Sequence, residues 1–135
     1  MQYWLVKSEP EEYSFQDLMG KEDDIWDGIR NYQARNFLKS MQMGDLMLFY
    51  HSGKEKAIVG VSKVVEEAFP DPKDEEGKGW VAVRLQGVKV FEFPFTLAMI
   101  KEDPACASLP LLKQSRLSVM PVEKEVFDHI LAQAQ

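Results

Sequence analysis

The sequence predicts a mixed α+β fold, a small and partly open β-barrel with short helices at its rim. Segments rich in apolar and β-branched residues recur along the chain at the length of strands. The segments with helical spacing between them are short, so they suit helices that cover the rim of a barrel. The 135 residues fit one domain, and no repeat or Pro/Gly/Ser linker divides them. A single domain over residues 1–135 is therefore expected.

The chain is expected to open with a strand followed by a brief helix. Residues 3–6 form a short apolar run that is typical of a strand. Ser14 and Asp17 have the spacing of a capping box, in which each side chain bonds the backbone N–H of the other residue. This spacing predicts a helix that begins after Ser14 and ends at Met19.

A longer helix and a pair of strands are predicted next. From Tyr32, apolar residues recur at helical spacing, with Asn31 in front as an N-cap and Gly44 beyond the end. The runs at residues 46–50 and 58–65 are apolar or β-branched, and the polar residues between them suit a hairpin loop.

The second half of the chain is expected to continue the sheet and to end in a helix. Residues 70–79 are charged and rich in turn-forming residues, which indicates an exposed loop between two strands. Gln86 and Gly87 separate two further apolar runs. The predicted elements are strands at 80–85 and 88–95, helical turns at 96–101 and 110–114, a strand at 117–119 and a helix that begins at Pro121.

Composition excludes several classes of protein. The net charge of −6 and the pI near 4.9 argue against a protein that coats long stretches of nucleic acid, so any nucleic-acid contact should be local. No apolar run reaches the roughly 18 residues of a membrane span. The start of the sequence lacks the pattern of a secretory signal, so an intracellular location is expected, cytoplasmic or, in a eukaryote, nuclear. Cys106 is the only cysteine and can form no internal disulfide. A monomer is favoured.

The segment from Trp26 to Ser52 has a different makeup from the rest of this acidic chain. After Asp27 its only acid is Asp45, whereas it contains Arg30, Arg35 and Lys39 along with several aromatic and amide side chains. Such a basic, aromatic and amide-rich stretch is suited to a planar polar ligand such as a nucleobase.

Six stretches closely resemble the EVE domain, which is the domain of the thymocyte nuclear protein family and its bacterial relatives. They are YWLVKSEPEEYSFQDL, WDGIRNYQARNFL, GDLMLFYHS, AIVGVSKV, EAFPDP and RLSVMPV, in the expected order along nearly the whole chain. The resemblance implies a PUA-like β-barrel, the fold shared by PUA, ASCH and YTH domains. It also implies a role in binding modified bases in DNA or RNA through a pocket on the barrel.

A pocket for an extruded base needs flat apolar faces to replace its stacking and polar groups to match its edge. The candidate faces are Trp4, Trp26, Tyr32 and Tyr50, and the candidate edge-binding groups are Ser8, Asn31, Gln33, Asn36, His51 and Ser52. Arg30 and Arg35 are the candidate phosphate-binding residues.

Structural roles compete with these assignments. Trp4 suits a core position as well as a pocket, and Trp80 suits the core or the rim of the barrel. Asn31 can also act simply as a helix cap, without any contact to a ligand. Glu9 could accept a hydrogen bond from an exocyclic amino group, or remain a solvated acid.

No motif predicts catalysis, a metal or a cofactor. His51 could act as a base, but no positioned nucleophile with an orienting acid accompanies it, and Cys106 has no catalytic signature around it. The two histidines and one cysteine show no metal-ligand spacing. Two non-catalytic hypotheses remain: a reader of modified bases, or a small-molecule-sensing or protein-interaction module that uses the same pocket. A positive rim around the pocket would favour the first, and a negative rim the second.

Overall fold

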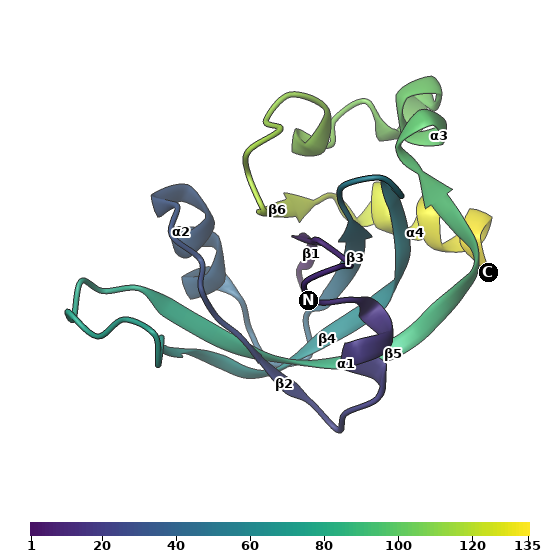
Figure 1. Cartoon of the computed structure of the whole chain (residues 1–135). Helices are drawn as coiled ribbons and strands as arrows, with labels where there is room; N and C mark the ends of the chain where they lie inside the picture. The colour runs from purple at the N-terminus through teal and green to yellow at the C-terminus, as the bar shows by residue number, and fades with distance from the viewer.

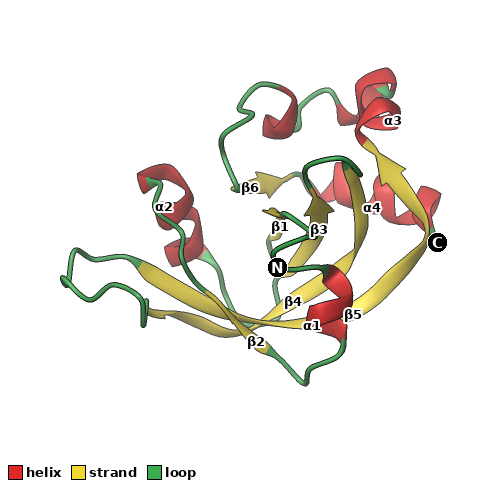
Figure 2. Ribbon diagram, viewed as in Figure 1, coloured by secondary structure: helices red, strands yellow, loops and turns green.

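The computed structural model describes all 135 residues, which form a curved six-stranded sheet with four α-helices around it (Figures 1 and 2). The strands are β1 (Tyr3–Ser8), β2 (Asp24–Trp26), β3 (Leu46–His51), β4 (Ala57–Pro70), β5 (Val81–Thr96) and β6 (Val119–Val122). Their order in the sheet is β2-β5-β4-β3-β1-β6. β1 and β3 run parallel and the other neighbours antiparallel. Because β2 and β6 do not pair, the barrel stays open, and the predicted α+β class is confirmed.

Local sequence signals set the ends of the helices. The helices are α1 (Phe15–Met19), α2 (Tyr32–Ser40), α3 (Leu97–Glu102) and α4 (Lys124–Ala134), with 3-10 turns at Pro104–Cys106 and Pro110–Leu112. Ser14 and Asp17 form the predicted capping box. The Asn31 side chain accepts the Ala34 N–H at 2.9 Å, as predicted for an N-cap. None of the helices combines the length and the apolar character that crossing a lipid bilayer would take.

The predicted break in the sheet at Gln86 and Gly87 is wrong, because β5 runs through both residues. Gln86 pairs with Lys63 and Gly87 with Ser62, so the ladder with β4 continues. A Cβ atom at Gly87 would overlap the sulfur of Met19. The glycine therefore permits the close approach of α1 to the sheet, and it makes no turn.

Two other boundaries differ from the prediction. The last strand lies at Val119–Val122 rather than at 117–119, and Pro121 belongs to this strand rather than to the C-terminal helix. β6 is an edge strand that pairs only with β1, where a proline costs little because one side of the strand needs no donor. The three-residue strand β2 was not predicted, since it is too short to show an alternating pattern.

The core includes two of the predicted ligand faces, Trp4 and Tyr50. Trp4 is 3% exposed, and its indole N–H donates to Oδ2 of Asp45 at 3.0 Å. Asp45 also accepts the backbone N–H groups of Gln2 and Gln42. The assignment of Trp4 to the ligand pocket is therefore wrong, because its ring is buried and its only polar atom is already bonded.

A substitution of Gly60 should destabilise the protein strongly. A Cβ atom at Gly60 would overlap the buried Phe15 ring and lie 2.6 Å from the carbonyl oxygen of Lys89. Since the carbonyl belongs to the paired strand β5, Gly60→Ala should lower the free energy of unfolding by about 1–3 kcal/mol or more. Urea unfolding followed by circular dichroism measures this difference. Gly20→Ala, whose Cβ atom would come no closer than 3.4 Å, serves as the control. Equal stability of the two variants would contradict the expected clash.

Candidate functional site

A pocket of about 520 Å³ opens where the end of β1 faces β2. Its wall is built from the end of β1, the turn before α1, β2 with the residues that follow it, and Lys73 in the loop between β4 and β5. The volume lies within the range of sites that hold small organic ligands. The pocket is therefore large enough for a single nucleobase or a molecule of similar size.

Trp26 provides the largest flat surface of this wall. Its ring centroid lies 5.4 Å from that of Phe49 and 5.8 Å from that of Tyr13, both in edge-to-face arrangements. These contacts hold the half-buried indole in one orientation. Its Nε1 atom is buried and has no hydrogen-bond partner in the protein. A buried N–H donor without a partner is uncommon in a folded protein, so this atom is an unusual feature of the pocket wall.

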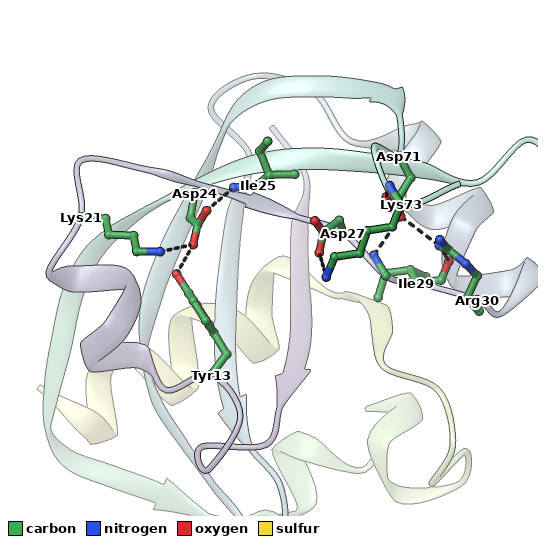
Figure 3. Close-up of polar contacts among 10 residues, drawn as sticks. Tyr13, Lys21, Asp24, Ile25, Asp27, Ile29, Arg30, Asp71 and Lys73 are labelled. Atoms are coloured by element: carbon green, nitrogen blue, oxygen red, sulfur yellow. Dashed lines mark hydrogen bonds and ion pairs between the residues drawn. The ribbon is translucent and has the colours of Figure 1, made fainter. Parts of the chain in front are cut away.

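Tyr13 and Asp24 form a hydrogen-bonded pair (Figure 3), and the Tyr13 ring also contacts the indole of Trp26. The Tyr13 hydroxyl donates to Asp24 at 2.6 Å, and Asp24 also accepts from Lys21 Nζ at 2.9 Å and from the Ile25 N–H at 2.8 Å. Burial and the Asp24 carboxylate both raise the pKa of Tyr13. Burial alone would raise the pKa of Asp24, but the hydrogen bonds from Tyr13 and Lys21 outweigh it and lower this pKa. At neutral pH the pair consists of a protonated phenol and a charged carboxylate.

Asp71, at the start of the loop between β4 and β5, binds residues that follow β2 (Figure 3). The buried carboxylate accepts from the N–H groups of Gly28 at 2.8 Å and Lys73 at 2.7 Å, and from Arg30 Nη1 at 2.9 Å. Burial alone would raise the pKa of Asp71, but these three bonds lower it. Lys73 in turn pairs with Asp27 at 3.1 Å. These contacts fix the residues that follow β2 against the loop.

The rim of the pocket is negative rather than positive. Four carboxylates and two lysines line it, a formal excess of two negative charges. Burial lowers the pKa of Lys7, whose Nζ atom donates to the carbonyl oxygen of Ser115. Lys73 is paired with Asp27, whereas the exposed side chains of Glu9 and Glu12 have no partner. The pocket therefore favours a ligand with hydrogen-bond donors over a phosphate.

The structure does not bring the candidate binding residues between Trp26 and Ser52 together, so the expectation that they share one pocket is wrong. Of the predicted residues, only Ser8 and Trp26 line the pocket. Asn31, Tyr32, Gln33 and Asn36 are exposed at or on α2. Ser52 is not part of the pocket wall; it lies next to the end of β1, where its backbone N–H donates to the carbonyl oxygen of Ser8.

Tyr50 and His51 are buried at 3% exposure each, because β3 is an inner strand of the sheet. His51 Nε2 accepts the Phe15 N–H at 3.0 Å, so its Nδ1–H donates to Glu55 at 2.7 Å. Both ring nitrogens thus hold α1 and the hairpin loop in place. The assignment of Tyr50 and His51 to the pocket is wrong for this reason.

Tyr32, Arg30 and Arg35 gather instead with Trp80 on a neighbouring surface, which we term the arginine–aromatic cluster. The rings of Tyr32 and Trp80 are stacked, with centroids 5.1 Å apart and planes at 28°. The guanidinium carbon of Arg35 lies 5.0 Å from the Tyr32 centroid and 5.7 Å from that of Trp80, and that of Arg30 lies 5.5 Å from Trp80. A second hollow of about 330 Å³ lies beside Arg30 and Trp80.

Most of the pocket wall was not predicted, and the residues of the two surfaces that the sequence did not indicate include Tyr13, Asp24, Lys73 and Trp80. Trp80 was placed in the core or at the rim without a ligand role, although a tryptophan beside a charged, glycine-rich loop was a usable signal. Asp24 lies two residues before Trp26 on β2, but this strand is too short to be predicted from its pattern. Tyr13 lies 11 positions before Asp24, and only the fold brings its hydroxyl to the carboxylate.

Neither Cys106 nor His129 lines the pocket. Cys106 is buried, and burial raises its pKa to about 11, so its thiol stays protonated at neutral pH. His129 pairs with Asp103 at 2.6 Å. No three His, Cys, Asp or Glu side chains come together in a way that could hold a metal ion.

Comparison with known proteins gives a consistent result over the whole chain. The family model of the EVE domain matches residues 2–133. Thymocyte nuclear protein 1 from Homo sapiens is 34% identical over 96% of this chain and 72% of its own length. Among solved structures, protein PSPTO5229 from Pseudomonas syringae is 42% identical, covers 98% of this chain and 99% of its own, and has a TM-score of 0.92. The human THYN1 protein in complex with DNA containing 5-methylcytosine is 33% identical, covers 100% of this chain and 98% of its own, and also has a TM-score of 0.92.

Proposed function

Since this chain belongs to the EVE domain family, we propose that it is a non-catalytic module that binds DNA carrying a modified base. The complex of the human THYN1 protein with 5-methylcytosine-containing DNA supports this function, because the two chains share their fold over nearly their full length. The observation on this chain that carries the proposal is the pocket beside Trp26, whose indole N–H has no partner within the protein.

The pocket offers the contacts that an extruded base requires. A base that leaves a DNA stack loses its neighbours, and the fixed Trp26 ring supplies a new flat contact. The unpaired indole N–H is buried, so it would donate to a carbonyl oxygen or ring nitrogen of the base only after a shift of the pocket wall that exposes it. The exposed carboxylate of Glu9 can accept from an exocyclic amino group, as acids do with cytosine. The negative rim was expected to favour the small-molecule or protein-interaction module, and it is compatible with a base only when the phosphates remain outside the pocket.

The test is a titration of the protein with two DNA duplexes that differ only in 5-methylcytosine against cytosine at one position. One methyl group in a fitted pocket contributes about 1–3 kcal/mol, so the modified duplex should bind roughly 10- to 200-fold more tightly. Fluorescence anisotropy at fixed salt measures both affinities. Equal affinity for the two duplexes would contradict a preference for the modified base. The absence of binding to both would overturn the proposed function.

The charge of the pocket favours a second candidate function, a small-molecule-sensing or protein-interaction module. Four carboxylates around the opening would attract a ligand or peptide with a positive charge. The same titration separates the two functions when an amine-containing small molecule or a lysine-rich peptide replaces the DNA. Binding of these probes together with no binding of DNA would establish the second function.

A further inference from the structure

The arginine–aromatic cluster lies outside the pocket and presents an aromatic ring to solvent. Tyr32 is 67% exposed although Trp80 stacks against it and Arg35 lies near its ring. Most large aromatic side chains of this chain are buried in the core or partly buried against it. An exposed ring that is held by a stacked neighbour provides a ready surface for another planar group.

Arg35 is the cation of this surface that no acid neutralises. Arg30 pairs with Asp71, Lys73 with Asp27 and Lys78 with Glu76. Arg35 has no carboxylate partner; its one hydrogen bond is a contact of 3.4 Å to the side chain of Asn36, and its Nε atom is buried without a partner. In a chain with a net charge of −6, an unpaired guanidinium beside two aromatic rings favours an anionic ligand that also carries a flat ring.

The loop that carries Trp80 is fixed before any ligand binds. The Asp74 carboxylate accepts the N–H groups of Lys78, Gly79 and Trp80, each at 3.0 Å. Gly79 has a φ of +92°, which a side chain would strain, and its open side lets Arg35 Nη1 approach. Because the ring and the cation are already in position, binding would require little ordering of side chains.

The cluster adjoins the pocket directly. Ile29 lines the pocket and the next residue, Arg30, lines the second hollow together with Trp80. Lys73 belongs to the walls of both. Since the rim of the pocket repels phosphate, the backbone of a bound DNA strand has to lie on a neighbouring surface, and this neighbour carries the free arginine.

We propose that Tyr32, Arg35 and Trp80 form a second DNA subsite, which holds the nucleotide next to the base in the pocket. The base of that nucleotide stacks on the exposed face of Tyr32, and its phosphate binds the Arg35 guanidinium. Trp80 is a positioning residue that supports the Tyr32 ring. This subsite rests on the proposed function, since it adds a flanking nucleotide to the base that enters the pocket.

The experiment compares two probes on the folded full chain: the nucleoside 5-methyl-2′-deoxycytidine, and a single-stranded DNA pentanucleotide with 5-methylcytosine at its centre. Tyr32→Ala should weaken binding of the pentanucleotide by about 5- to 150-fold, the effect of one lost base stack, and leave the nucleoside unaffected. Arg35→Gln should weaken the pentanucleotide and reduce the slope of log K against log salt by about 0.7, the contribution of one phosphate contact in a single strand.

Two matched variants control for the loss of an exposed ring or a charge elsewhere. Phe93→Ala removes an aromatic side chain that is 56% exposed on β5, and Lys101→Gln removes one exposed cation on α3, which Figure 1 shows far from α2. Both should bind the two probes as the parent protein does. Circular dichroism confirms that each variant is folded.

The outcomes distinguish the subsite from the proposed function. If the parent binds both probes and Tyr32→Ala and Arg35→Gln bind the pentanucleotide equally well, the subsite is overturned and the pocket function stands. An equal loss for nucleoside and pentanucleotide would also overturn the subsite, because the residues would then act through the pocket. A parent protein that binds neither probe overturns the proposed function and the subsite with it.

Discussion

Replacing Asp71 by alanine is expected to lower the free energy of unfolding by about 3 kcal/mol. The Asp71 side chain is fully buried and accepts three hydrogen bonds, so its removal leaves the N–H groups of Gly28 and Lys73 without an acceptor. The expected loss of stability lies at the lower end of the range measured when one partner of a buried ion pair is removed, because the Arg30 side chain is 37% exposed and water can solvate its guanidinium. Chemical unfolding of the variant and the parent at neutral pH measures the difference. The wall of the pocket should also loosen, so the variant should bind DNA more weakly.

The pH dependence of this difference provides an internal check. The pKa of Asp71 is lower in the folded protein than in the unfolded chain, so its charge stabilises the fold above the unfolded pKa of about 4. The stabilisation is lost as the pH falls through the lower folded pKa. The gap between parent and Asp71→Ala should therefore be constant near neutral pH and narrow below about pH 4. The Asp71→Asn variant keeps an acceptor oxygen but not the charge, so its free energy of unfolding near neutral pH should lie between those of the parent and Asp71→Ala. A gap that stays constant down to pH 2 would contradict the role assigned to the charge.

Replacing Trp26 by alanine is expected to weaken binding of 5-methylcytosine-containing DNA by about 1–3 kcal/mol, the contribution of one stacking contact. The variant loses the largest flat surface of the pocket wall. It also loses the edge-to-face contacts with Tyr13 and Phe49, so its stability should fall as well. The titration is therefore made at a temperature where circular dichroism shows the variant fully folded.

Trp26→Phe separates the two contributions of the indole. Phenylalanine keeps a flat ring but has no N–H donor. The Trp26→Phe variant should therefore lose less affinity for modified DNA than the Trp26→Ala variant does. A folded Trp26→Ala variant that binds modified DNA as tightly as the parent would refute the role of this ring. A Phe variant as weak as the Ala variant would assign the affinity to the indole N–H rather than to stacking.

Much of the fold could be read from local patterns because local interactions determine it. The capping box at Ser14 and the Asn31 cap satisfy backbone donors within three residues of themselves. The helix that Asn31 begins therefore starts where the sequence predicts. The errors at Gly87 and Pro121 have the opposite origin. Each residue is locally a breaker of structure, but Gly87 makes room for Met19, and Pro121 lies on an edge strand where its missing N–H has little cost.

Local patterns along the chain were enough to establish the fold class, the family resemblance and the presence of a basic, aromatic segment in an acidic protein. Which of those aromatic residues are accessible depends on the packing of the folded chain. Both faces of the inner strand β3 are buried, which excludes Tyr50 and His51 from the site, and the buried carboxylate of Asp45 accepts the indole N–H of Trp4. Residues from four separate segments line the pocket. They come together because β2 pairs with β5 and because Asp71, in the loop between β4 and β5, forms an ion pair with Arg30. Such contacts depend on pairing across 40 or more positions, and no local sequence pattern encodes them.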